Sequence, residues 1–283
     1  YFKPESTLND LAVKRYGQNV CQCVRQWHYS EQNRNSVDMA LFVNGIPIVA
    51  LELKDQLTGQ SVDNAKRQWR EDRDAKEPAF RLNHRVLIFF GVDLYETVMT
   101  TKLNGEKTRF LPFNQGSNGP GVDGGAGNPQ RDDGDYVTAY LWRDVLQKDS
   151  LLDIIQKFIH FDAKEKKLIF PRYHQLDVVR RLIADVRENG PGQNYLIQHS
   201  AGSGKSNSIA WTAYRLASLH DSDNKPVFNS VVIVTDRTVL DAQLQETISD
   251  FDHQPGSVVA IDEKKSSKDL RDALNDGKRI IVT

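Results

Sequence analysis

Cysteine is scarce in this sequence, and long apolar runs and any excess of charge are missing. The 283 residues include two cysteines, Cys21 and Cys23, which are too close together to bridge readily. No second pair exists to complete a zinc site, so we expect free thiols in a cytoplasmic protein. No apolar run approaches the roughly 20 residues that span a membrane. We also expect no membrane partner, and we find no cleavable signal, although the chain starts at Tyr1.

The charge balance excludes a protein that is basic throughout. Lys and Arg number 37 against 38 Asp and Glu, which gives a net charge of −1. This balance does not exclude a nucleic-acid partner, because local patches set the affinity for phosphate. The length suits two domains of ordinary size.

Residues 1–165 are expected to form a mixed α/β domain. The first hundred residues indicate strands and hairpins with one helix. The expected strands are 36–43, 46–53, 85–90 and 94–101, and the expected helices are 61–73 and 151–161. Residues 114–135 are rich in Gly, Asn, Pro and Asp, which predicts a long mobile loop. The charged run 164–167 is interpreted as the connection between domains.

Residues 166–283 alternate short apolar strands with helices. The expected strands are 195–198, 231–235, 258–261 and 279–282, and the expected helices are 206–219, 238–250 and 267–275. This alternation predicts a parallel sheet covered by helices.

The most specific segment is HSAGSGKS, residues 199–206, between a short apolar run and a helix. Gly202 and Gly204 let the backbone turn so that amide protons, including that of Ser203, face phosphate oxygens. Lys205 supplies charge for the outer phosphates, and Ser206 offers a hydroxyl to Mg²⁺. The segment therefore predicts ATP binding, although His199 replaces the usual first glycine. A Gly-Ser loop with an unrelated lysine is the alternative.

Two flanking segments resemble motifs of superfamily-2 helicases. RYHQ, residues 172–175, resembles the adenine-reading glutamine motif, in which Gln175 would contact the base. The run VVIVTDR, residues 231–237, resembles the motif that contacts the DNA backbone. A surface glutamine and a plain strand with its loop are the alternatives.

A second constellation consists of Asp38, Glu52 and Lys54. The Asn44-Gly45 pair predicts a tight hairpin, in which Asp38 lies opposite Leu51. A bulge near Pro47 would bring Asp38 onto the face that Glu52 and Lys54 already share. Two carboxylates suit Mg²⁺, and the ammonium suits the charge on a phosphate under attack.

The three residues match the PD-(D/E)xK nuclease pattern, with Val37 in place of the proline. The spacing alone also fits an exposed ion pair between Glu52 and Lys54. However, these charges stand in the apolar run IVALELK, where they are expensive to place without a role.

The order of the motifs resembles the restriction (HsdR) subunits of type I restriction-modification enzymes. The similar segments are SVDMALFVNGIPIVALELK, FLPFNQG, GAGNP, YLWRDVLQKDSLLDIIQKFIHF, RYHQ, QHSAGSGKS and VVIVTDRTVLDAQL. The resemblance implies a PD-(D/E)xK nuclease domain followed by the first part of a RecA-like motor domain. It also implies ATP-driven DNA translocation, Mg²⁺-dependent cleavage of double-stranded DNA away from the recognition site, and modification and specificity subunits as partners.

The resemblance further assigns the nuclease roles to Asp38, Glu52 and Lys54. Gln68 matches the glutamine of a QxxxY motif in related nucleases, but Asp72 stands at the tyrosine position. Residues 279–283 resemble the strand that precedes a DEAD/H-type box. We therefore expect the chain to stop before Walker B and to be unable to hydrolyse ATP by itself.

Three other functions are compatible with the sequence. The first is another nuclease-helicase fusion, from DNA repair or phage defence. The second is a restriction enzyme that carries its own methyltransferase. The third is a DNA-binding scaffold with degenerate sites, against which the intact Asp38, Glu52, Lys54 and Lys205 argue.

Overall fold

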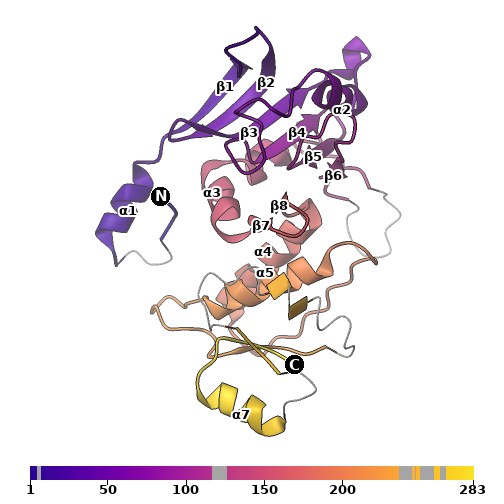
Figure 1. The fold of residues 1–283 in the computed structure, drawn as a ribbon. Coiled ribbons are helices and arrows are strands. Elements are labelled where there is room, and N and C mark those ends of the chain that lie inside the picture. Colours follow the sequence, from indigo (N-terminus) through magenta and orange to yellow (C-terminus); the bar gives the residue numbers. More distant parts are fainter. Residues whose placement is uncertain (5–7, 117–125, 236–243, 246, 249–257, 262–265) are drawn as a thin grey trace. The chain divides into compact units, whose positions relative to one another are not determined.

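The chain is described here by a computed structural model, which covers residues 1–4, 8–116, 126–235, 244–245, 247–248, 258–261 and 266–283. Contacts divide it into two compact units, Tyr1–Tyr173 and His174–Thr283. Both units combine helices with strands (Figure 1), which confirms the expected α/β class.

The first unit is built around a six-stranded mixed sheet. Its strands are β1 (Cys21–His28), β2 (Ser36–Val43), β3 (Ile46–Leu53), β4 (Ile88–Val92), β5 (Thr97–Thr100) and β6 (Leu111–Pro112), in that order across the sheet. Neighbouring strands are antiparallel except β3 and β4, which are parallel. A parallel pair needs a crossover, and α2 (Val62–Glu71) provides it.

The β2–β3 hairpin has a tight turn and one irregularity. Asn44 and Gly45 form the turn with positive φ angles of 53° and 81°, which Asn and Gly tolerate better than other residues. The register shifts by one residue between Leu41 and Phe42. The pairs beyond the shift are Leu41 with Val49, Ala40 with Ala50 and Met39 with Leu51. The bulge expected near Pro47 is therefore confirmed.

Helix α2 lies against β3 and β4 (Figure 1). It begins with a capping box, in which the Ser61 backbone N–H donates to Asn64 Oδ1 at 2.9 Å. Trp69 is fully buried on its inner face, and the indole Nε1 donates to the Phe90 carbonyl at 3.0 Å. The helix is thus held by a cap at its start and by a buried aromatic residue near its end.

Gly91 of β4 lets the helix approach the sheet closely. A Cβ atom at this position would lie 2.9 Å from Cβ of Ala65 on α2 and 3.1 Å from Cγ2 of Val98 on β5. Atoms essentially never pack at the shorter of these distances. The spacing between α2 and the sheet therefore requires glycine at this position.

Further elements complete the first unit. They are α1 (Asp10–Gly17), the 3₁₀ turn η1 (Gln56–Thr58), the π-helical turn η2 (Leu141–Val145), α3 (Lys148–Lys157), β7 (His160–Asp162) and β8 (Lys167–Ile169). The expectation of one helix in the first hundred residues was wrong, because α1 precedes the sheet. Its N-cap is Asn9, whose side chain accepts from the Ala12 N–H at 3.0 Å.

The charged run 164–167 does not connect the units. It forms the turn of the antiparallel β7–β8 hairpin and the start of β8. Phe170, just after β8, packs edge to face on Phe90, with ring centroids 6.3 Å apart. The first unit therefore extends to Tyr173, beyond the boundary expected at residue 165.

The second unit contains a three-stranded parallel sheet. Its strands are β9 (Val231–Ile233), β10 (Val258–Ala260) and β11 (Ile280–Val282), in the order β10-β11-β9. Its helices include α5 (Lys205–Ala217) and α7 (Ser267–Asn275), and α4 (Tyr173–Asn189) starts at the unit boundary. Helix α5 packs on β9 and β11. The expected parallel sheet with covering helices is confirmed for these elements.

One expected strand is not formed. Residues 195–198 pair with no strand among the described residues, and Leu196 is 92% exposed. An apolar run becomes a strand only where a neighbour satisfies its backbone groups. Ile197 and Val231 instead line an apolar cavity of about 220 Å³. The helix expected at 238–250 lies mostly outside the described residues.

The loop expected at 114–135 is described only in part. Residues 114–116 and 126–135 contain no helix or strand, and residues 117–125 lie outside the described residues. Among the described helices, none is long and apolar enough to cross a membrane.

Candidate active site

The β2–β3 hairpin brings Asp38 and Glu52 together. Met39 pairs with Leu51 in the antiparallel hairpin. The residue before Met39, Asp38, therefore faces the residue after Leu51, Glu52. Lys54 follows β3, two residues after Glu52, and its backbone N–H donates to the Val92 carbonyl at 2.8 Å. The sheet therefore places all three predicted residues at the same end of one hairpin.

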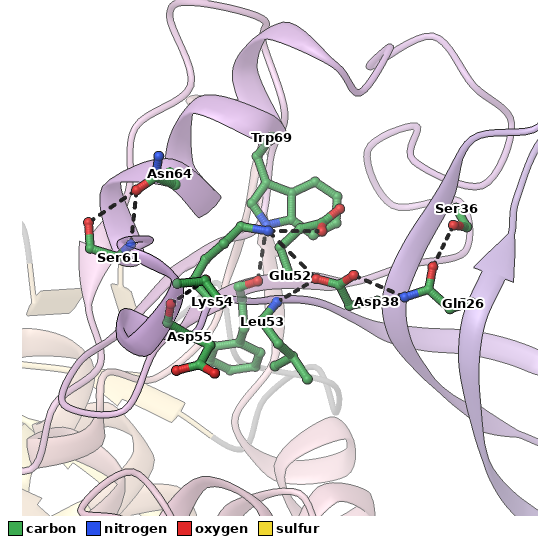
Figure 2. Close-up of polar contacts among 12 residues, drawn as sticks. Gln26, Ser36, Asp38, Glu52, Leu53, Lys54, Asp55, Ser61, Asn64 and Trp69 are labelled. Carbon is green, nitrogen blue, oxygen red and sulfur yellow. Dashed lines mark hydrogen bonds and ion pairs between the residues drawn. The ribbon is translucent and has the colours of Figure 1, made fainter.

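The three charged groups form a compact cluster (Figure 2). Lys54 Nζ lies 3.7 Å from Asp38 Oδ2 and 3.9 Å from Glu52 Oε2. The side chain of Lys54 is 9% exposed and that of Glu52 is fully buried. The alternative of an exposed ion pair is therefore excluded by the burial of both partners.

Glu52 is held by Arg73, which follows α2 and its C-cap residue. Arg73 Nε and Nη2 lie 2.8 Å and 2.6 Å from the same oxygen, Glu52 Oε1. Burial raises the pKa of Glu52 to about 8; Asp38 adds to this increase, whereas Arg73 opposes it. The arginine thus both fixes the side chain and offsets part of the penalty for ionising it.

Asp38 is held through both of its oxygens. Oδ2 accepts the Leu53 backbone N–H at 2.8 Å. Oδ1 accepts from the Gln26 side-chain amide at 3.2 Å, and Gln26 Oε1 accepts the Ser36 hydroxyl at 2.9 Å (Figure 2). The carboxylate is therefore oriented by β1, β2 and β3 together.

The cluster suits a divalent cation on the chemistry of its donors. Glu52 Oε2 is buried and accepts no hydrogen bond, and the Lys54 ammonium, 3.9 Å away, is too far to donate one. A divalent cation would satisfy this oxygen directly. Among the described residues, no group of three or more His, Cys, Asp and Glu side chains could hold a metal. Mg²⁺ needs no such cage, since it usually binds one or two carboxylates and keeps several waters. Asp38 and Glu52 are the two carboxylates available here.

The QxxxY resemblance places Gln68 on α2, where its side chain is half-buried. None of the hydrogen bonds found among the described residues joins this side chain to the cluster. Asp72 is the exposed C-cap of the helix. The residue from this segment that reaches the cluster is Arg73, which sequence reasoning missed. The sequence around Arg73 does not indicate this role, because Arg73 meets Glu52 only when α2 packs against β3.

The residues of the expected phosphate loop turn tightly before a helix, as their glycines predict. Gly202 and Gly204 have positive φ angles of 71° and 83°, and α5 begins directly after them. Ser203 is buried at the turn, and Ser206 is the second residue of the helix. The first turn of α5 thus points its amides towards the loop, as an anion site requires.

Lys205 folds back onto the loop. Its ammonium donates to the carbonyl of Ser200 at 2.8 Å and to that of His199 at 3.1 Å. Gln175 is buried on α4, and its amide donates to the Gly204 carbonyl at 2.8 Å. His174 Nε2 lies 3.1 Å from the Ser203 carbonyl. The glutamine segment therefore contacts the loop itself.

Comparisons with known proteins match each unit separately. Residues 6–108 match the family model described as "Type I restriction enzyme R protein N terminus". Residues 174–283 match the family described as "SWI2/SNF2 ATPase". The first match contains Asp38, Glu52 and Lys54, and the second contains Gln175 and Lys205.

Two curated relatives match across both units. The chain is 29% identical over 223 residues to the "Type I restriction enzyme HindI endonuclease subunit" of Haemophilus influenzae, with 75% of this chain and 19% of that protein covered. It is 24% identical over 254 residues to the "Putative type I restriction enzyme MjaVIIIP endonuclease subunit" of Methanocaldococcus jannaschii, with 84% and 22% covered. The chain spans about a fifth of the length of these relatives.

These findings define a protein that joins a restriction-endonuclease domain to an ATPase domain of the SWI2/SNF2 kind. Within that class, the match of residues 6–108 and the two relatives together support an R (HsdR) subunit of a type I restriction enzyme.

Proposed function

We propose that this chain is part of a subunit that translocates double-stranded DNA by ATP hydrolysis and cleaves both strands in an Mg²⁺-dependent reaction, away from the recognition site. Its partners in that role are the modification and specificity subunits, because the DNA site would be recognised by a subunit other than the one that carries the motor and the nuclease. The two relatives, named endonuclease subunits of type I restriction enzymes, support this assignment.

The observation that carries the nuclease proposal is the buried, hydrogen-bond-free Oε2 of Glu52, which lies in a cluster with Asp38 and Lys54. Asp38 and Glu52 would hold the cation. When bound, Mg²⁺ supplies a water of lowered pKa and neutralises charge on the phosphate.

Lys54 then acts beside the carboxylates. Its ammonium lies within 4 Å of both of them, so it stands next to any phosphate bound there. A fixed ammonium in a partly dry site stabilises negative charge that develops during attack more strongly than it would in water. Arg73 and the Leu53 N–H keep the two carboxylates in place while this happens.

The nucleotide would bind at residues 202–206. The ammonium of Lys205 now satisfies the carbonyls of Ser200 and His199, and it would leave them for the outer phosphates. Ser206 would contribute its hydroxyl to Mg²⁺. For Gln175 to contact adenine, its amide would turn from the Gly204 carbonyl to the base edge.

The test of the nuclease uses a full-length subunit that contains this sequence, assembled with its partners. Glu52→Gln and Lys54→Ala are each expected to slow DNA cleavage by at least about a hundred-fold, because each removes a charge from the reacting centre. ATP hydrolysis should continue at the parent rate, because Glu52 and Lys54 lie in the other unit.

The matched control is Glu96→Gln, which removes an exposed carboxylate from the same unit and should leave cleavage unchanged. Normal cleavage by Glu52→Gln would contradict the assigned site. Loss of ATP hydrolysis by a folded Lys54→Ala protein would contradict the separation of the two activities.

A further inference from the structure

Gln26 has an unusual backbone for a residue inside a strand. Its φ is +47°, in the left-handed region that residues other than Gly and Asn rarely adopt. Among the described residues, the other non-glycine residues with positive φ are Asn44, Asn83, Lys166 and Asn224, and none of them lies inside a strand. Strained backbone of this kind persists only where the surrounding structure enforces it, and it gathers at functional sites.

The strain coincides with a gap in the strand pairing. Arg25 pairs with Met39 and Trp27 with Val37, but Gln26 is not paired with Asp38, the residue across from it. The side chain makes the contact that the backbone does not. Gln26 Nε2 donates to Asp38 Oδ1 at 3.2 Å (Figure 2).

The orientation of the amide is set by its second partner. The Ser36 hydroxyl donates to Gln26 Oε1 at 2.9 Å, which leaves the NH₂ group to face the carboxylate. The Ser36 carbonyl accepts from Arg73 Nη2 at 2.8 Å, and Arg73 holds Glu52. Ser36 therefore connects the groups that orient both carboxylates.

We propose that Gln26 is a positioning residue of the nuclease site, held in a strained conformation so that its amide fixes the Asp38 carboxylate for metal binding. This inference rests on the proposed nuclease function. Removing a residue that hydrogen-bonds to a metal ligand and orients it usually weakens metal binding by about 10- to 100-fold. Because Gln26 is exposed, the fold can lose its side chain without leaving a cavity.

Two variants separate the amide from the strain. Gln26→Gly relieves the backbone and removes the amide, whereas Gln26→Met keeps the side-chain length and the strain but removes the amide. Both are expected to weaken Mn²⁺ binding to the 283-residue chain by about ten-fold or more. The melting temperature should be unchanged or higher for Gln26→Gly, so stability and metal affinity would move independently. Mn²⁺ binding is measured directly by titration, without DNA or ATP.

The matched control is Lys166→Gly, which relieves a similar φ of 48° in the β7–β8 turn of the same unit. It should leave Mn²⁺ affinity unchanged. Parent affinity in both Gln26 variants, with weak binding by Glu52→Gln, would overturn the role of Gln26 and leave the nuclease assignment standing. Parent affinity in Glu52→Gln would overturn the metal site itself. Equal losses in Lys166→Gly and the Gln26 variants would assign the effect to the fold and overturn the positioning role.

Discussion

The carboxylate cluster of the first unit and the proposed phosphate loop of the second hold their charged groups in opposite ways. Glu52 is fully buried, and Arg73 binds one of its oxygens through two nitrogens. Lys205 is exposed, and its ammonium donates to carbonyls of its own loop. In the first unit distant parts of the chain meet at the site, whereas in the second unit neighbouring residues make it.

This difference indicates how each site is prepared for its ligand. A carboxylate fixed by a buried arginine keeps its geometry without a ligand, so little reorganisation remains when a cation binds. Lys205 would have to exchange its carbonyl partners for phosphate oxygens to bind a nucleotide as proposed. We therefore expect changes to the buried Glu52–Arg73 pair to alter folding stability and changes to Lys205 to alter ligand affinity alone.

The largest expected effect comes from breaking the buried pair. Arg73→Met should lower the free energy of unfolding by about 3 kcal/mol, because it removes the buried hydrogen bonds to Glu52 and to the Ser36 carbonyl and leaves the Glu52 carboxyl either protonated or charged without a partner. The double variant Arg73→Met with Glu52→Gln should recover much of this loss. Chemical denaturation of the 283-residue chain at pH 8 measures both.

Arg143→Met is the control, since Arg143 also makes two ion pairs, with Asp133 and Asp135, but at the surface. Its effect should be close to the error of measurement, because exposed ion pairs stabilise little. An equal loss in Arg73→Met and Arg143→Met would remove the contrast between buried and exposed charge.

The next effect should appear in ligand affinity alone. Lys205→Ala should weaken the binding of an ATP analogue by about a hundred-fold or more, because the outer phosphates lose their positive charge. The melting temperature should hardly change, since the side chain is exposed. In a full-length subunit, ATP hydrolysis should be lost, and cleavage that depends on translocation should be lost with it.

Lys268→Ala provides the comparison for Lys205, because it removes another exposed lysine from the same unit. It should bind the analogue as the parent does. Tight binding by Lys205→Ala would show that residues 202–206 do not form the nucleotide site.

The smallest effect is a pH dependence that belongs to the first site. The pKa of Glu52 is raised from 4.5 to about 8, so the folded chain binds its proton more tightly than the unfolded chain does. Stability from this group is present below pH 4.5 and is lost as the pH rises through 8. Between pH 6.5 and 7.5, the parent should lose about 1 kcal/mol relative to Glu52→Gln in metal-free buffer. A difference between the two that is independent of pH would show that Glu52 is ionised throughout.

The parts of the structure predicted from the sequence are those with local causes. Asn44-Gly45 determines a turn, Pro47 indicates a bulge, and a two-residue spacing puts Glu52 and Lys54 on the same side of the chain. The glycines at 202 and 204 define the conformation of the proposed phosphate loop in the same way. These features lie within a single hairpin or a single turn.

The contacts missed by sequence reasoning arise between distant segments. Arg73 reaches Glu52 because α2 crosses over to place β4 beside β3. Gln26 reaches Asp38 because β1 forms the edge of the same sheet. Residues 195–198 show the opposite failure, since an apolar run predicts a strand but cannot predict whether a neighbour is present to pair with it.

Gly91 has a consequence for attempts to move this cluster into another protein. It is paired with Glu52 across the parallel strands, and a methyl group there would meet Ala65 of α2 at 2.9 Å. The helix that ends next to Arg73 can lie this close to the sheet only because the position carries no side chain. A graft of Asp38, Glu52 and Lys54 onto a foreign hairpin would reproduce the charges and lose the arginine that orients them. A transplant that keeps its geometry has to carry the glycine and the helix as well, so the smallest portable unit runs from β1 to β4.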